Sequence, residues 1–488
     1  MNIRALVHVI GLILMAVSAA VGVSSLVALW YGDGDFVPLL VSTAIPMVVG
    51  FAAYRSTRLD RELRVREGYA VVSLAWLAVG IAGAVPYLLA HTVSSPVSAL
   101  FESVSGFTTT GATIFEELEK LPHGILFWRS LTQWLGGMGI IVLGIAILPY
   151  LGVGGMQLFR AEVPGPTPER LQPRIAQTAK LLWIVYAGLT AAQVLFYLLG
   201  GVGLFDAVAH AFTTLSTGGF SPHTASLAAF SPYIQYVTIV FMLLAGINFA
   251  HHYRALTGRP GVYARDPEFR FYLAVLGGAF VVVLVTVWLG GSYATLGFER
   301  AFRDSLFHVV SITTTTGYVS HDYELWPFGA QFLLLLLMFV GGMSGSTGGG
   351  MKVVRLNILM RHGFAELRKS INPRAVIVTR VGRRAIREDV LLNVLAFVLL
   401  YLSLFALGVL VLALLGHDLA TAAGAAAAAI GNIGPGLGKV GAVDHYGWMD
   451  PGSHIVLVFL MLVGRLEIFT VLLLFHPDMW RSAHFART

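Results

Sequence analysis

The sequence contains no cysteine among its 488 residues, and few of its residues carry charge. Without cysteine there are no disulfide bonds, cysteine-ligated zinc sites, iron–sulfur clusters or catalytic thiols. Charged residues make up only 12% of the chain, hydrophobic residues make up 56%, and the mean hydropathy is +0.76. This composition excludes an ordinary soluble protein and predicts an all-α membrane protein that crosses the bilayer many times.

The formal net charge of +6 does not indicate nucleic-acid binding, because the basic residues fall in short loops between apolar runs. The N-terminal stretch resembles a signal peptide, with Arg4 followed by apolar residues. Its apolar run continues to about Trp30, which is too long for a cleaved leader, so we interpret it as a retained first span.

An enzyme using His251 and His252 is an alternative, but no HExxH or paired-acid pattern supports it, so we expect no enzymatic activity.

Apolar runs of about 20 residues, the length needed to cross a bilayer, recur along the chain. We expect ten full spans, at residues 5–30, 36–54, 69–91, 125–151, 179–201, 232–250, 270–290, 329–359, 389–416 and 453–476. Four further segments reach only about 20 Å as helices and cannot cross. They are residues 96–110, 203–217, 301–316 and 418–433. Because such segments are tolerated only inside protein or beside water, they predict a central aqueous path.

Basic residues gather in every second loop. These loops are residues 55–66, 160–180, 254–270 and 352–387. The intervening loops are acidic or neutral, as at residues 32–35 and 115–121. Since arginine-rich and lysine-rich loops stay in the cytoplasm, we expect both termini to be cytoplasmic and the short segments to enter from outside. The basic stretch 352–387 is also a candidate docking surface for a cytoplasmic partner.

A short hydroxyl-rich motif ending in glycine recurs beside the apolar runs. It reads "TTTG" at Gly111, "LSTG" at Gly218, "TTTG" at Gly317 and, more divergently, "GNIG" at Gly434. After two N-terminal spans (residues 1–66), the chain repeats the order span, short segment, motif, span four times. We therefore expect four units, at residues 67–160, 161–265, 266–387 and 388–488.

The second span of each unit supports this repeat. Their centres read "QWLGGMGI" (133–140), "MLLAGINF" (242–249), "MFVGGMSG" (338–345) and "MLVGRLEI" (461–468). In this alignment Arg465 takes the position of Gly137, Gly246 and Gly342.

The motif suits the binding of a dehydrated alkali cation. Potassium filters replace the water shell of the ion with rings of backbone carbonyls, and glycine lets the backbone turn successive carbonyls toward one axis. Threonine hydroxyls add oxygens, and the C-terminal ends of the short helices favour a cation. Packing of small residues between helices is the alternative for a single motif, but four copies favour an ion site. The candidate filter residues are Thr109, Thr110, Gly111, Ser216, Thr217, Gly218, Thr315, Thr316, Gly317, Asn432, Ile433 and Gly434.

These motifs resemble the Trk/Ktr/HKT superfamily of K+ transporters, which is built from four linked units of span, pore loop and span. The resemblance covers nearly the whole chain, and the two extra N-terminal spans are similar to its TrkH-type branch. It implies K+ uptake across the bacterial cytoplasmic membrane, with K+ as the bound metal ion and substrate and no other cofactor. It also implies a homodimer surrounded by membrane lipid, with a cytosolic nucleotide-binding regulatory subunit of the TrkA type.

A glycine-rich stretch, "GGMSGSTGGGMK" (341–352), interrupts the eighth span. It fails the nucleotide-binding Walker pattern, because Met351 separates Gly350 from Lys352 and valine follows the lysine. So many glycines should break the helix, and the resemblance implies an intramembrane gating loop. The candidate gate residues are Gly345, Ser346, Thr347, Gly348, Gly349, Gly350, Lys352 and Arg465.

Arg465 lies near the middle of an apolar span, where a charge costs about 2.5–3.5 kcal/mol on insertion scales and is by default functional. We expect it to form an electrostatic barrier below the ion site. Glu467 should point elsewhere on a continuous helix, and a pair between Arg465 and a carboxylate on another span is the alternative.

Two further questions stay open at this level. A weakly selective K+/Na+ translocator of the same architecture is an alternative, because each unit has one filter glycine and the fourth replaces the threonines. Proton symport competes with a channel-like mode, which we favour because the spans hold few carboxylates beyond Glu467.

Overall fold

The computed structural model describes residues 3–58, 65–146, 172–375, 378–382 and 384–480. Helices make up nearly all of their regular secondary structure. The exception is one antiparallel hairpin of two short strands, β1 (Arg380–Val381) and β2 (Arg384–Ala385), in which Arg380 lies opposite Ala385. The expected all-helical membrane fold is therefore confirmed for the described part of the chain.

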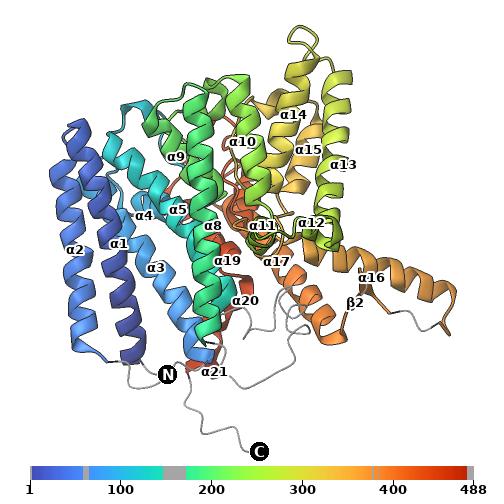
Figure 1. Ribbon diagram of the computed structural model, residues 1–488, viewed down its shortest axis with the longest axis horizontal. Coiled ribbons are helices and arrows are strands. Elements are labelled where there is room, and N and C mark those ends of the chain that lie inside the picture. Colours follow the sequence, from blue (N-terminus) through green and yellow to red (C-terminus); the bar gives the residue numbers. More distant parts are fainter. Residues whose placement is uncertain (1–2, 59–64, 147–171, 376–377, 383, 481–488) are drawn as a thin grey trace, which may run out of the picture.

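Among the described residues, six helices are long and apolar enough to cross a membrane. They are α1 (Ile3–Tyr31), α2 (Phe36–Ser56), α3 (Val65–Leu89), α8 (Gln172–Leu199), α13 (Pro267–Leu289) and α17 (Glu388–Leu414). Helix α5 (His123–Ala146) corresponds to the expected span 125–151, whose last residues lie outside the described part. In Figure 1, α1 and α2 stand side by side at one edge, whereas α16 projects from the opposite side.

The four short segments form helices, as expected. They are α4 (Pro96–Phe107), α9 (Leu204–Leu215), α14 (Phe298–Thr313) and α18 (Leu419–Gly431). Local sequence explains where two of them begin: Ser95 accepts a hydrogen bond from the amide of Ser98, and Asp418 accepts one from Thr421. Each helix is largely buried and ends at a hydroxyl- or glycine-rich motif, so the fold brings four helix C-termini to the motifs.

Three spans are broken, two of which we expected to be continuous and one, at the glycine-rich stretch, which we expected to break. Helices α10 (Pro232–Ala245) and α11 (Phe249–Leu256) meet at 100°, and α19 (Pro451–Arg465) meets the segment containing α20 (Ile468–Leu472) at 119°. Helix α15 (Phe328–Leu337) is separated from α16 (Val353–Ile371) by the glycine-rich stretch. Each break begins within the eight residues that the alignment of the inner spans matches, which are 242–249, 338–345 and 461–468.

Physical causes of these breaks are local. Asn248 caps α11, because its side-chain oxygen accepts a hydrogen bond from the amide of Ala250 at 2.9 Å. Glu467 has a φ of +62°, which a continuing right-handed helix does not allow.

The remaining short helices are α12 (Val262–Arg265), α21 (Pro477–Trp480), η1 (Leu118–Lys120), η3 (Ser226–Ala229), η4 (Tyr323–Leu325) and η5 (Leu473–Phe475).

Helices of successive repeats interlock. Helix α5 packs on α9 of the next repeat, α10 packs on α14, and α19 returns to pack on α4. A side chain at Gly136 would overlap the carbonyl oxygen of Phe107, and one at Gly464 would overlap that of Ile430. These matching contacts support the alignment of the inner spans, since Phe107 and Ile430 occupy equivalent ends of α4 and α18. The first and last repeats therefore lie together, far apart as they are in sequence.

Candidate ion-binding site

The four motifs adopt the same backbone conformation just beyond the short helices. In each, one non-glycine residue has a left-handed φ: 53° at Thr109, 55° at Thr217, 61° at Thr315 and 54° at Asn432. Two residues later, a glycine also has a positive φ. These glycines are Gly111 (81°), Gly219 (76°), Gly317 (78°) and Gly434 (101°). The agreement extends to the fourth motif, whose sequence differs most.

Hydrogen bonds establish the same register. The residue before each glycine donates its amide proton to a carbonyl in the last turns of its own short helix. The pairs are Thr110 to Ser105 (2.8 Å), Gly218 to Thr213 (2.8 Å), Thr316 to Ser311 (2.8 Å) and Ile433 to Ala428 (2.9 Å). In the second repeat, the counterpart of Gly111 is therefore Gly219, and our assignment of Gly218 from the sequence was one residue early. Two adjacent glycines made the sequence register ambiguous there.

Three of the left-handed residues are threonines, which is unusual. A β-branched residue rarely adopts a positive φ, and such backbone costs on the order of 1–3 kcal/mol per residue. The surrounding structure holds Thr109, Thr217 and Thr315 in it all the same, and all three are fully buried. Strain repeated at equivalent positions points to a functional demand on the backbone, and sequence patterns do not reveal it.

Each of the four glycines lies against a carbonyl oxygen of another repeat, and these contacts form a closed cycle. A side chain on Gly111 would overlap the carbonyl oxygen of Gly218, and one on Gly219 would overlap that of Thr316. A side chain on Gly317 would likewise overlap the carbonyl oxygen of Ile433. The cycle closes because the space beside Gly434 holds the carbonyl oxygen of Thr110, 2.8 Å from where a Cβ would lie. A carbonyl oxygen of another repeat thus occupies the space beside each glycine, and only glycine fits there.

Side-chain oxygens complete this region. Within the described residues, Thr109 Oγ1 and Asn432 Oδ1 are buried without a hydrogen-bond partner. Unpartnered oxygens are costly unless something binds them. The amide nitrogen of Asn432 donates to Thr110 Oγ1 at 3.0 Å and to the carbonyl of Met461 at 2.9 Å. The fourth motif therefore supports the first directly.

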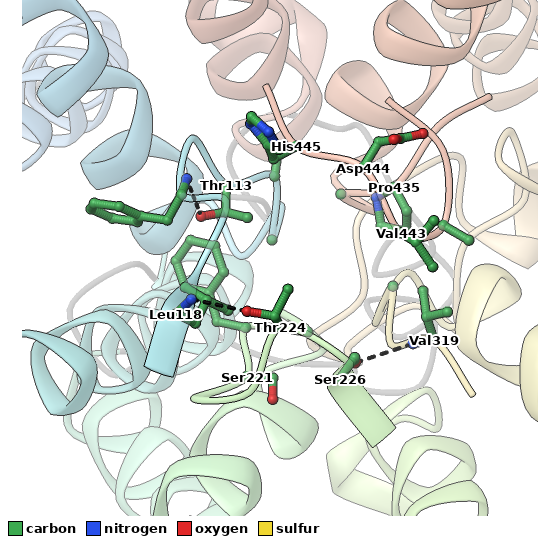
Figure 2. A pocket seen from close by; sticks show the side chains of 18 of the residues that line it. Thr113, Leu118, Ser221, Thr224, Ser226, Val319, Pro435, Val443, Asp444 and His445 are labelled. Atoms are coloured by element: carbon green, nitrogen blue, oxygen red, sulfur yellow. Dashed lines mark hydrogen bonds between the residues drawn. The ribbon is translucent and has the colours of Figure 1, made fainter. Parts of the chain in front are cut away.

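One end of this region opens into a hollow that the loops after the motifs surround. The hollow touches all four glycines named above and also Glu116, His223, Asp444 and His445. Figure 2 shows that its walls come from different parts of the chain. Leu118 donates to Thr224 Oγ1 at 2.9 Å, and the amide of Val319 donates to Ser226 Oγ at 3.3 Å, so loops of neighbouring repeats are tied together.

His223 forms an ion pair at this rim. Its Nε2 lies 3.2 Å from Asp206 Oδ1, and its Nδ1 lies 3.9 Å from Glu119 Oε1. The hydrogen bond that His223 donates to Asp206 raises the pKa of His223 above its ordinary value, against the opposing effect of partial burial.

At the other end, the glycine-rich stretch touches the motifs. The amide of Gly349 donates to Thr315 Oγ1 at 2.7 Å, and Thr347 Oγ1 donates to the carbonyl of Leu215 at 2.9 Å. The stretch is non-helical, as expected, and Lys352 Nζ donates to the carbonyl oxygen of Gly348. The Gly349 amide therefore bonds to the third motif, and the Thr347 hydroxyl bonds to the end of the short helix before the second motif.

Arg465 is buried and reaches this stretch. Its Nη1 donates to the carbonyl of Thr347 at 2.7 Å, and its Nη2 donates to that of Gly136 at 3.3 Å. No ion pair joins Arg465 to a carboxylate of the described chain, so the alternative of a structural ion pair is not supported there. The guanidinium is held by backbone oxygens and keeps its charge unneutralised.

Glu467 has a different partner, which the sequence did not reveal. It forms an ion pair with Arg355 at 2.5 Å, and the Arg355 guanidinium lies 3.8 Å from the ring centroid of Phe397. The expectation that Glu467 does not pair with Arg465 is confirmed. The helix break at Glu467 turns its side chain toward α16, and no local pattern connects positions so distant in sequence.

The two histidines that we considered for catalysis have structural partners. His251 Nε2 lies 2.5 Å from Asp266 Oδ2, and His252 Nδ1 lies 2.9 Å from Tyr263 Oη. In the part of the chain that the structure describes, no group of three or more His, Asp or Glu side chains could hold a metal ion. Backbone and hydroxyl oxygens are thus the candidate cation ligands.

Comparisons with known proteins point in one direction. The sequence profile of TrkH, described as a cation transport protein, matches residues 41–482. The chain is 41% identical to the Trk system potassium uptake protein TrkH of Escherichia coli over 99% of its own length and 100% of that protein. It is 34% identical to TrkG of E. coli over 99% of both chains. The crystal structure of the potassium transporter TrkH from Vibrio parahaemolyticus is similar at a TM-score of 0.91 and 40% identity, covering 99% of this chain and 100% of that one.

The His223–Asp206 pair predicts a pH dependence of stability. A histidine whose pKa is raised by folding stabilises the fold fully below its ordinary pKa, and this contribution is lost as pH rises through the raised value. We expect the thermal unfolding midpoint in detergent to fall between pH 6 and pH 8, and to fall less in Asp206→Asn, which lacks the acceptor charge. An identical pH slope in both proteins would show that the pair contributes nothing.

Proposed function

The chain belongs to the TrkH family of cation transport proteins, and we propose that it takes up K+ across the bacterial cytoplasmic membrane through the site described above. The family is one of transporters, in agreement with the expectation that the protein is not an enzyme. Relatives that carry the name potassium uptake protein support K+ as the cargo.

The cycle of glycines and carbonyl oxygens is the observation that carries this proposal. Four backbone segments approach so closely that each glycine touches the carbonyl oxygen of the next repeat. Rings of carbonyl oxygens at such close quarters replace the hydration shell of K+ in selective filters. The filter residues are those named from the sequence, except that the second-repeat set moves one residue along the chain to Thr217, Gly218 and Gly219.

The arrangement of the repeats supports a pore on the axis of this cycle. We propose four units, at residues 67–160, 161–265, 266–387 and 388–488, with residues 1–66 as two peripheral spans. The C-terminal ends of α4, α9, α14 and α18 meet at the filter, and their partial negative charge favours a cation. The hollow beyond the glycines is then the outer mouth, and both chain termini are cytoplasmic, as the basic loops indicate.

The glycine-rich stretch and Arg465 are the proposed gate. The stretch lies on the inner side of the filter, where Gly349 and Thr347 bond to filter and pore-helix oxygens. Arg465 holds the carbonyl of Thr347 and places a positive charge in the path. A cation leaving the filter must displace both, so the gate combines a steric and an electrostatic barrier.

A weakly selective K+/Na+ translocator is the second candidate. The observation that favours it is the unequal filter, in which the residue before the glycine is Thr110, Gly218, Thr316 or Ile433. Three different residue types at this position make a less regular cage than four identical strands.

We further propose a channel-like mode and an assembly like that implied by the family resemblance. Two partly buried carboxylates near the gate have partners: Glu467 pairs with Arg355, and Glu268 accepts the amide proton of Ser344 at 2.6 Å. The fixed cation of Arg355 engages Glu467, the one carboxylate in the last inner span, which favours a channel-like mode over symport. The expected homodimer, TrkA-type regulatory subunit and surrounding lipid remain part of the proposal.

The proposal is tested by measuring K+, Rb+ and Na+ flux into vesicles that contain the purified protein, with and without a proton gradient. We expect K+ and Rb+ flux to exceed Na+ flux, and Gly317→Ala to reduce K+ flux at least roughly tenfold, because its methyl group overlaps a filter carbonyl. Gly277→Ala is the matched control, since no atom lies within 4 Å of the added methyl group. Absence of K+ flux, or equal flux in both variants, contradicts the filter assignment.

Arg465→Ala tests the gate. Removing the guanidinium eliminates the positive charge and the bond to Thr347, so we expect K+ flux to rise several-fold. Arg465→Lys keeps the charge but cannot hold two carbonyls in the same way, and should give an intermediate flux. Flux that is unchanged in Arg465→Ala at every K+ concentration would eliminate the barrier.

A further inference from the structure

A side chain of the first repeat reaches the filter of the second. Gln133 on α5 is fully buried, and its Nε2 donates to the carbonyl oxygen of Gly218 at 2.7 Å. Its Oε1 accepts the amide proton of Phe220 at 3.0 Å. Both polar atoms of this amide are thus committed to one short stretch of a neighbouring strand.

These two bonds hold both peptide groups that flank Gly219. The carbonyl of Gly218 belongs to the peptide group before Gly219, and the amide of Phe220 belongs to the one after it. Rotation about the φ or ψ angle of Gly219 would break one of the two bonds. Gln133 therefore holds Gly219 at its φ of 76°, a conformation that glycine would otherwise leave freely.

Arg129, one helical turn earlier on α5, extends this support. Its Nη1 donates to the carbonyl of Ser221 at 3.1 Å, and its Nε pairs with the buried Glu102 at 2.8 Å. Its guanidinium also lies 4.1 Å from the ring centroid of Phe220. The ion pair joins α5 to α4, and the contacts of Arg129 with Ser221 and Phe220 join α5 to the strand that Gln133 holds.

The other repeats lack this arrangement. In the alignment of the inner spans, the positions equivalent to Gln133 are methionines: Met242, Met338 and Met461. The positions equivalent to Gly218 are β-branched: Thr110, Thr316 and Ile433. A β-branched residue restricts its own backbone, whereas glycine does not.

Gln133 and Gly218 are also matched in space. A Cβ on Gly218 would overlap the amide group of Gln133. The second repeat therefore has room for the glutamine only because residue 218 is glycine, and its flexible strand is held only because residue 133 is glutamine. In the other repeats, a methionine stands at the position of Gln133 and a β-branched residue stands at the position of Gly218.

We propose that Gln133 is a positioning residue that determines K+ over Na+ selectivity by holding the second strand of the filter. The proposal rests on the K+ uptake function proposed above. Discrimination against Na+ depends on the carbonyl oxygens keeping the number and separation that suit the larger ion. Released from Gln133, the Gly218–Gly219 pair is free to adjust its carbonyl toward a smaller ion.

The test is the ratio of K+ to Na+ flux in vesicles for Gln133→Met, which installs the residue of the other three repeats. We expect the ratio to fall roughly three- to tenfold, the range expected for losing one or two buried hydrogen bonds. Met242→Leu, a swap of similar volume at the equivalent position, is the control and should keep the wild-type ratio. If Gln133→Met does not fold, Gln133→Asn keeps the amide but is too short to reach, and the same fall is expected.

A double substitution sharpens the test. Gly218→Thr alone should also lower the ratio, because its side chain collides with Gln133. Gln133→Met combined with Gly218→Thr recreates the pair found in the third filter strand and should return the ratio toward the wild-type value. A double variant with a lower ratio than either single variant contradicts the pairing.

The remaining outcomes separate this inference from the function on which it rests. A wild-type protein that carries no K+, or carries Na+ equally well, overturns the proposed selective uptake itself. A selective wild type whose ratio is unchanged in Gln133→Met overturns only the role of Gln133. If K+ and Na+ fluxes fall in the same proportion in Gln133→Met, the role of Gln133 in selectivity is also overturned, because the residue then has a structural role alone.

Discussion

The close approach of four backbone segments is the constraint on which the rest of the structure depends. Each segment places a glycine against the carbonyl oxygen of its neighbour, and a single methyl group at Gly111, Gly219 or Gly317 would collide with it. To meet there, the segments must enter from four short helices that stop inside the protein and turn through left-handed residues such as Thr109. The strain of that turn is tolerated because the surrounding helices pack tightly around it.

The four segments share a backbone conformation, yet different groups hold three of them. The second is held by Gln133, the third by the amide of Gly349 on Thr315, and the first by Asn432 of the fourth. The repeat therefore determines where the oxygens lie, whereas each unit has its own means of keeping them there. Because the supports differ, one segment can be connected to the glycine-rich stretch, as Thr315 is through Gly349, without the same contact in the others.

Much of this architecture could be predicted from the sequence. The short helices are visible as apolar segments too short to cross a membrane. In the alignment of the inner spans, Arg465 takes the position that glycine holds in the other three. Two features could not be predicted. The register at Gly218–Gly219 is ambiguous because glycine accepts either conformation, and the bend after Arg465 depends on the φ of Glu467, which an apolar pattern does not encode. The ion pair of Glu467 with Arg355 was hidden for the same reason, because it exists only when the helix is broken.

That break explains why two opposite charges, two residues apart, act on the same loop. Arg465 points to the carbonyl of Thr347 within the glycine-rich stretch, whereas Glu467 binds Arg355 on the helix that follows the stretch. The fourth unit thus holds the loop of the third unit both in its middle and at its exit. Breaking a buried ion pair costs about 3–5 kcal/mol, so local fluctuation of the glycines alone does not release the stretch from its partners. In the gate proposed above, opening would therefore involve movement of α19 and α16 relative to each other, and a partner that shifted α16 would act on the proposed ion path.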